Sequence, residues 1–186
     1  NPVSEELPTV DFSLTVENKD RKFDIENSES SANFLEVGQT IEALYGQDLE
    51  DGATEWIPGI NLILTDWSAD DDEMYFSAAD RFTQMNETYY RGKYREDGIT
   101  LYDLALDVLQ DASVDLRTVW LDPYLKNVVV NNPMPAVTHK EALQLIANAG
   151  RCVLYQGRTG EIYLRSSFRA DLSAEAEDGV YYSDTS

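Results

Sequence analysis

The first half of the chain is dominated by short runs in which polar and apolar residues alternate. Four such runs occupy residues 11–16, 39–45, 60–67 and 73–78. A side-chain period of two is the pattern of a strand with one buried face, and closely spaced strands of this kind are typical of a sandwich or small barrel. We therefore predict a β-barrel-like domain over residues 1–97, with residues 46–52 as an acidic hairpin loop.

After residue 97 the period changes, because apolar residues recur every three or four positions. Leu101, Leu104 and Val108 lie on one face of a predicted helix, and Thr100 stands where it can cap the first turn. A short strand is expected over residues 127–131, where apolar residues are bounded by asparagines. This segment therefore begins a unit of a different kind from the first.

A second helix is predicted to follow, and its two ends are marked in the sequence. Thr138 and Glu141 have the spacing of a capping box, and Gly150 stands where a helix commonly ends in a left-handed residue. A hairpin over residues 152–164 completes the unit. Residues 98–168 are thus predicted to be a compact α+β domain of helix, strand, helix and hairpin, so the whole chain is β-rich α+β.

The chain is strongly acidic, since 35 Asp and Glu against 14 Lys and Arg give a formal net charge of -21. A field of this sign repels phosphate backbones and anionic lipid, which argues against sequence-specific nucleic-acid binding and against membrane binding. No apolar run approaches the roughly 20 residues of a membrane helix, so no membrane insertion is expected. Residues 169–186 are expected to be a linker or the start of a further domain that is missing from this chain.

Cys152 and His139 are each the single residue of their kind in the chain. One cysteine excludes an internal disulfide framework and a Cys-rich zinc site. Cys152 opens a predicted buried strand, so we expect a small core residue rather than a nucleophile. His139 follows the predicted N-cap Thr138, where the helix dipole disfavours the imidazolium, and no nucleophile motif accompanies it. Neither residue is therefore assigned a catalytic role.

Acidic residues gather in two predicted turns, at residues 70–73 and 48–52. Calcium takes several carboxylate oxygens, but neither cluster has the alternating spacing of a calcium-binding loop. An acidic-pair hydrolase would need two close carboxyl groups in a cleft, one with a raised pKa, and the sequence identifies no such pair. The glycines match neither a P-loop nor a dinucleotide-binding motif. We therefore predict no catalytic, cofactor-binding or metal-binding residue.

Aromatic residues offer a second kind of surface, because the chain has 11 tyrosines. The pairs Tyr89–Tyr90 and Tyr181–Tyr182 could be exposed binding surface, although aromatic residues in β-rich proteins more often pack across strands. An exposed aromatic platform in the β domain would favour a carbohydrate-binding or receptor-adhesion module. The tryptophans that could contribute to it are Trp56, Trp67 and Trp120.

Two stretches carry a resemblance to known proteins. Residues 12–38 read FSLTVENKDRKFDIENSESSANFLEVG, and residues 138–155 read THKEALQLIANAGRCVLY, followed by a Gly-Arg-Thr-Gly hairpin tip. In this order they resemble the tail hub and baseplate proteins of phages and prophages, in which a D-N-x-D-G-x-F-x-P-x-N turn precedes L-x-x-G. Glu17 stands for the first Asp, Arg21 for the turn glycine and Ile25 for the proline.

The resemblance covers most of residues 10–166 and implies a structural virion component without catalytic residues in these domains. Hub proteins of this class carry tail-tube-like barrels that assemble, usually as trimers, into a ring joining the tail tube to the tip or spike. It implies other tail proteins as partners, a homo-oligomer for the full-length protein, and a place in the virion tail after synthesis in the bacterial host cytoplasm. The alternatives are the carbohydrate-binding or receptor-adhesion module and the acidic-pair hydrolase.

Overall fold

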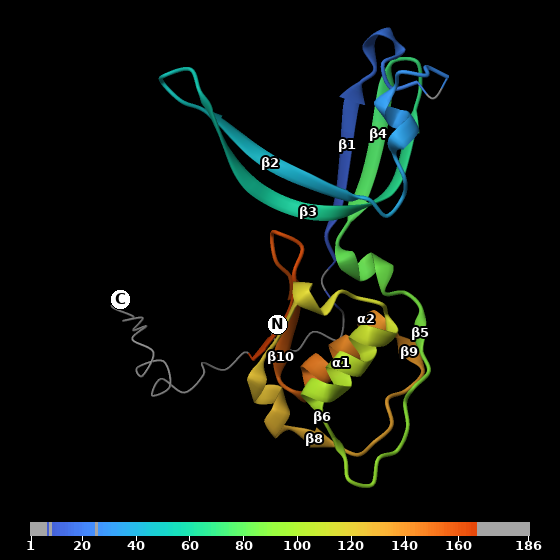
Figure 1. The fold of residues 1–186 in the computed structure, drawn as a ribbon, viewed down its shortest axis with the longest axis vertical. Coiled ribbons are helices and arrows are strands. Elements are labelled where there is room, and N and C mark those ends of the chain that lie inside the picture. The colour runs from blue at the N-terminus through green and yellow to red at the C-terminus, as the bar shows by residue number, and fades with distance from the viewer. Residues whose placement is uncertain (1–6, 8, 25, 167–186) are drawn as a thin grey trace.

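The computed structural model describes residues 7, 9–24 and 26–166, and it is β-rich α+β as the sequence predicts. A curved antiparallel sheet lies at one end of the long axis and a helix-containing unit at the other (Figure 1). No helix in the described part of the chain is both long and apolar enough to span a membrane. The exact boundary between the two predicted domains, and the role of residues 169–186, which lie outside the described residues, stay predictions.

The sheet at the first end has four antiparallel strands. Their order is β1 (Asp11–Glu17), β4 (Glu73–Ala79), β3 (Thr54–Ala69) and β2 (Thr40–Asp48). The long strand β3 belongs to two pairings, with β2 as far as Ile63 and with β4 from Ile63 onward. The two pairings overlap at this one residue, so each half of β3 has a different neighbour.

Two shifts in register bend β3. In the pairing with β2, Gly59, which follows Pro58, has no residue opposite it. In the pairing with β4, Thr65 likewise has no residue opposite it. A bulge bends its strand and increases the local twist, and proline is tolerated within a sheet mainly at bulges and edges. The bulges accompany a turn of the β2–β3 hairpin away from β1 and β4 (Figure 1).

The projecting hairpin, residues 40–60, is called the arm below. Its strands run to Asp48 and resume at Thr54, and the turn between them is closed by the hydrogen bond from Leu49 N to Ala53 O. The prediction of a loop over residues 46–52 was therefore wrong for residues 46–48, which belong to β2. Gly46 lies directly opposite Trp56 in the ladder, so this glycine serves cross-strand packing rather than a turn.

The sheet is open among the described residues, with β1 and β2 at its edges, and the closed barrel stays a prediction. Its buried apolar residues are few. They include Leu62, Leu64, Met74 and Ala78 from the sheet and Ala32 from the loop that follows β1. This end of the molecule therefore holds only a thin core.

Two short 3₁₀ turns lie between β1 and β2, and a third follows β4 and leads to the helical unit. They are η1 (Lys19–Arg21), η2 (Ser31–Phe34) and η3 (Arg81–Gln84). The side chains of Ser30 and Asp80 accept backbone N–H bonds and cap η2 and η3. Arg21 has a φ of 54°, so it adopts a left-handed conformation at the place where the tail hub pattern has glycine.

The helix-containing unit holds the remaining elements. They are β5 (Thr88–Tyr89), β6 (Ile99–Thr100), α1 (Leu101–Asp111), η4 (Leu116–Thr118), β7 (Val119–Leu121), η5 (Pro123–Asn127), β8 (Val129–Val130), β9 (Val137–Thr138), α2 (His139–Ala149), β10 (Cys152–Gln156) and β11 (Ile162–Ser166). The strand predicted over residues 127–131 is shortened to β8. The predicted hairpin is present as β10 and β11, and β7, which the sequence did not predict, pairs in parallel with β11.

Both helices pack on one face of the β10–β11–β7 sheet and form the main core. Buried residues of α1 and α2, such as Val108 and Ile146, join Leu154 and Leu164 of the sheet in one apolar cluster. Tyr89, from the segment that leads into this unit, is also fully buried in the cluster. Most of the apolar burial that stabilises the fold is therefore in this unit.

The predicted helix caps are present, but the predicted end of α2 differs in detail. Thr100 accepts the Asp103 N–H, and Thr138 and Glu141 form the full capping box. Gly150 is not left-handed, since its φ is -84°, and the left-handed residue is Arg151 with φ 51°. Glycine is favoured at position 150 by packing, because a Cβ there would lie 2.5 Å from a methyl carbon of Leu125.

Hydrogen bonds to Asn61 of β3 and to Arg81 of η3 join the sheet to the helical unit. Gln156 of β10 donates through Nε2 to Asn61 O and accepts through Oε1 from Arg81 N, each at 2.7 Å. Asn61 N also donates to Arg158 O at 2.8 Å, and its side chain donates to Thr159 O at 3.2 Å. The hairpin tip of the helical unit is thereby attached to the middle of β3.

Replacing Gln156 by leucine is expected to loosen this junction. The Gln156→Leu change keeps the volume but leaves Asn61 O and Arg81 N without their partner, which should cost about 1–3 kcal/mol. Urea-induced unfolding measures the loss. Arg158→Ala is the matched control, because position 158 contributes its backbone carbonyl to the junction. Equal stability of the two variants would contradict this account.

Candidate functional site

The arm exposes large apolar side chains on both of its faces. The exposed fractions are 45% for Leu44, 72% for Tyr45, 61% for Trp56 and 47% for Ile57. The ladder pairs Tyr45 with Ile57 and places Trp56 opposite Gly46, so one aromatic side chain lies on each face of the ribbon. Exposed apolar residues gathered on one element indicate a surface for interaction.

Each of the two aromatic rings lies against a glycine of the opposite strand. A Cβ on Gly46 would come within 2.8 Å of the Trp56 ring, and one on Gly59 within 2.8 Å of the Tyr45 ring. The glycines therefore allow the rings to lie on the backbone of the ribbon. The rings are held in place while much of their surface stays accessible.

Both edges of the arm lack a neighbouring strand in the described part of the chain. The outer edge of β2 is the edge of the sheet, and residues 54–62 of β3 pair only with β2. Unpaired edges offer N–H and C=O groups to another strand, and an isolated two-stranded hairpin is marginally stable in water. The arm thus combines exposed apolar faces with unpaired backbone groups.

The acidic cluster at residues 48–52 forms the turn of the arm. Asp48 accepts a hydrogen bond from Thr54 Oγ1 at 2.8 Å, and Asp51 accepts one from Ala53 N at 3.0 Å. These bonds are typical of aspartates that stabilise turns. This end of the arm is strongly acidic, because Asp48, Glu50, Asp51 and Glu55 are all exposed and no basic residue lies among residues 47–55.

The acidic cluster at residues 70–73 also forms a turn. Asp70 accepts the N–H groups of Asp72 and Glu73 at 2.9 and 2.7 Å. The bond from Glu73 N is the main cause that lowers the pKa of Asp70 below its usual value. Across the described residues, no group of three or more His, Cys, Asp or Glu side chains is arranged to hold a metal ion.

Cys152 is a buried core residue, as predicted, with 2% of its surface exposed. Burial raises the pKa of its thiol to about 11, so the thiolate needed for nucleophilic attack is scarce at neutral pH. Burial also raises the pKa of Asp80, but this carboxylate is only 2% exposed and accepts the backbone N–H groups of Val10 and Phe82. It ties the start of β1 to η3 inside the protein rather than lining a cleft.

His139 is buried between the helices, where its Nε2 lies 3.0 Å from Asp111 Oδ2. The other carboxylate oxygen of Asp111 lies 2.7 Å from Arg91 Nε. The Tyr89 ring packs against the imidazole edge to face, with 6.2 Å between the ring centroids. His139 therefore links α2 to α1 and to the segment that carries Arg91.

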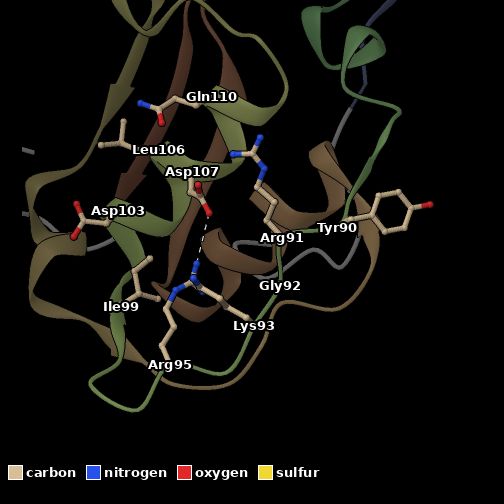
Figure 2. Close-up of a pocket in the computed structure, with 10 residues that line it drawn as sticks. All are labelled: Tyr90, Arg91, Gly92, Lys93, Arg95, Ile99, Asp103, Leu106, Asp107 and Gln110. Carbon is tan, nitrogen blue, oxygen red and sulfur yellow. Dashed lines mark ion pairs between the residues drawn. The ribbon is translucent and has the colours of Figure 1, made fainter.

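A groove of about 660 Å³ lies between α1 and residues 90–95, which are called the basic segment below (Figure 2). The segment lines it with Arg91, Lys93 and Arg95, and α1 contributes Asp103 and Asp107. Three of the 14 Lys and Arg residues of the chain thus fall within five positions. The sequence shows this density of positive charge in an acidic chain, but our sequence analysis did not single it out.

Tyr89 connects the groove to the core. Its hydroxyl donates to Asp107 Oδ2 at 2.6 Å, and Arg95 Nη2 lies 3.6 Å from the same oxygen. Burial, with the neighbouring Asp107 carboxylate, raises the pKa of Tyr89 to about 12. Asp107 and Asp111 of α1 are thus paired with Arg95 and Arg91 of the basic segment, an arrangement that fits a structural contact better than a catalytic pair.

The three tryptophans, all among the described residues, do not gather into one platform on the β domain. Trp56 is on the arm, and Trp67 is half-buried near the end of β3. Trp120 is 40% exposed and begins a row across the outer face of the β7–β11–β10 sheet. In this row Trp120 lies 6.4 Å from Tyr163, which stacks on Tyr155 at 5.2 Å. Tyr181 and Tyr182 lie outside the described residues.

No family model matches the chain, and no curated protein matches it in sequence. Among solved structures, it is similar to the 43 kDa tail protein of prophage MuSo2 from Shewanella oneidensis, with TM-score 0.43 and 13% identity over 88% of this chain and 47% of that one. It is also similar to a tail protein from Neisseria meningitidis MC58, with TM-score 0.44 and 15% identity over 83% and 45% of the two chains. The chain therefore spans about half the length of these two proteins.

The Tyr89 contact predicts a specific loss of stability at alkaline pH. The pKa of Tyr89 is about 12 in the folded protein and about 10 in an unfolded chain, so between these values the native state holds a proton that the unfolded state has released. Stability should fall as pH rises through this window. In Tyr89→Phe the fall should be smaller, as measured by urea unfolding from pH 8 to about 11.

Tyr90→Phe is the matched control, because the Tyr90 side chain is next in the chain and 79% exposed. It should keep the full alkaline loss of stability. If both variants lost stability in parallel with the unchanged protein above pH 10, the assigned role of Tyr89 would be wrong.

Proposed function

We propose that this chain is a structural component of a phage or prophage tail, a baseplate hub or tail-tip protein that joins the tail tube to the tip through protein–protein contacts without catalysis. The observation that carries the proposal is the arm. Tyr45 and Trp56 expose 72% and 61% of their surface on a two-stranded ribbon whose edges have no further strand in the described residues. The resemblance of residues 12–38 and 138–155 to tail hub proteins supports the choice of a phage tail as the assembly.

An arm of this kind is suited to assembly rather than to binding a small molecule. A partner that covers both faces removes apolar surface from water, which stabilises the complex by about 25 cal/mol for each Å² buried. The backbone of the partner can also form hydrogen bonds with the unpaired edges of the arm. A groove for a small ligand would instead be concave and largely apolar. The arm instead projects from the rest of the sheet (Figure 1).

The unpaired edges of the sheet suggest how the predicted barrel could form. The sheet has β1 and β2 as unpaired edges, and in a ring of identical subunits such edges are paired or covered by neighbours. We propose that the barrel closes when the full-length protein assembles, as a homotrimer in contact with the tube and the tip or spike. In the virion tail the exposed apolar residues of the arm would then be buried.

Immunogold electron microscopy tests the location directly. Antiserum raised against this chain is applied to tailed particles induced from the source strain, and gold is expected at the distal end of the tail. Antiserum absorbed with the purified chain is the control and should give no label. Absence of gold on both intact and detergent-opened particles, with the antigen present in the lysate, would contradict a virion role.

A carbohydrate-binding or receptor-adhesion module is the second candidate, and one observation favours it. The row of Trp120, Tyr163 and Tyr155 offers aromatic faces at the surface of the helical unit, with the Arg165 guanidinium 5.2 Å from the Trp120 ring. Tryptophan fluorescence titrated with host surface polysaccharide tests it. A saturable change that Trp120→Ala abolishes and Trp67→Phe retains would favour adhesion over assembly.

A further inference from the structure

The helical unit carries an apolar cleft of about 290 Å³ between α1, α2 and the loop before β9. Leu101, Leu104 and Ile146 form its buried base. Its rim includes Met134 and Leu145, and Leu145 is 41% exposed. A concave apolar surface of this size can accept one large side chain of a partner.

The basic segment adjoins the wall of this cleft. Gly92 packs against the backbone of Met134 so closely that a Cβ on Gly92 would lie 2.0 Å from Met134 O. Asn131 also connects the basic segment to the loop before β9. Arg95 N donates to Asn131 O at 3.2 Å, and Asn131 Nδ2 donates to Arg95 O at 3.0 Å. The cleft and the basic segment thus share one wall.

The basic segment has side chains available to a partner. Tyr90 and Tyr94 are 79% and 67% exposed. Arg91 pairs with Asp111 while its own side chain stays 62% exposed. Lys93, which lines the groove of Figure 2, is exposed and forms no ion pair among the described residues. One free ammonium group and one partly exposed guanidinium group therefore belong to the segment whose backbone adjoins the wall of the cleft.

The arm has the complementary properties. It presents Trp56 and Ile57 as exposed apolar side chains, next to a turn that carries four exposed carboxylates among residues 48–55. An apolar side chain could enter the cleft while the acidic turn meets the basic segment. Matching potentials of this kind orient partners and suppress wrong pairings.

One molecule cannot make this contact with itself. The arm projects at the end of the long axis opposite to the basic segment, which lies at the far side of the helical unit (Figure 1). The two surfaces can meet only when they belong to different molecules. Both are present in this chain, so a second copy supplies the missing partner.

We propose that the arm of one copy docks in the cleft of a second copy, with Trp56 in the apolar cleft and the acidic turn against the basic segment. This contact rests on the assembly role proposed above and specifies its surfaces. It is head-to-tail, because each molecule uses its arm on one neighbour and its cleft on another. Contacts of this type close into a ring or continue as a filament.

Complementation between two variants tests the proposal. Trp56→Ala removes the arm's aromatic side chain, and Leu145→Glu places a charge on the rim of the cleft. Sedimentation velocity should show association of the unchanged chain and a weakening of about tenfold or more in each variant alone. An equimolar mixture should form a dimer and nothing larger, because it contains one intact arm and one intact cleft.

A matched control separates this effect from a change in folding. Val153, on the outer face of β10, is 39% exposed and lies outside the cleft, so Val153→Glu should associate like the unchanged chain. If the mixture of Trp56→Ala and Leu145→Glu stays monomeric, the proposal is wrong. A Leu145→Glu variant that associates normally, as expected if two arms pair with each other, would also overturn it.

Charge reversal provides a second test that does not alter the apolar residues. Lys93→Glu should weaken association, and mixing it with Glu50→Lys should restore part of the loss. Association should also weaken as salt concentration rises. If the unchanged chain is monomeric at all concentrations, the contact is wrong, whereas gold label at the tail end would still support the tail function. The two proposals therefore fail separately.

Discussion

Strand β3 pairs with two different strands along its length, and the architecture of the sheet depends on where one pairing ends and the other begins. It pairs with β2 up to Ile63 and with β4 from Ile63 onward, so the two strand pairings overlap only at Ile63. Every backbone N–H and C=O group needs a partner or water. The part of β3 that belongs to the arm therefore has one edge without a neighbouring strand, and the bulges at Gly59 and Thr65 accompany the turn of the arm away from the rest of the sheet.

This arrangement places stability and exposure at different ends of the molecule. The apolar cluster of the helical unit contains the fully buried Tyr89 and Leu164, whereas no residue of the arm is buried. The junction at Asn61 and Gln156 connects the two through hydrogen bonds rather than a shared apolar core. A well-packed unit thus carries a projecting ribbon, and the ribbon presents the surface on which the proposed assembly depends.

Much of the local structure could be predicted from the sequence. The alternating runs became strands, and Thr100 and Thr138 cap helices as expected, because caps and periodicity depend on neighbouring residues. The glycines were harder to interpret. Gly46 and Gly150 both looked like turn or helix-end residues, yet one supports the Trp56 ring and the other fits beside Leu125, and these contacts join residues from separate elements.

The sequence by itself determined the β-rich α+β class, the first residues of both helices, the acidic charge and the core position of Cys152, because composition and short-range patterns govern these features. The tertiary structure alone decided that β7 lies parallel to β11, that β3 divides between two partners, and that the basic segment meets the Met134 loop. These contacts join residues distant in sequence, and a local pattern cannot encode which distant surface a strand or loop will meet. The exposure of both Tyr45 and Trp56 follows from that long-range choice, since a closed sheet would bury whichever of these two residues faced its interior.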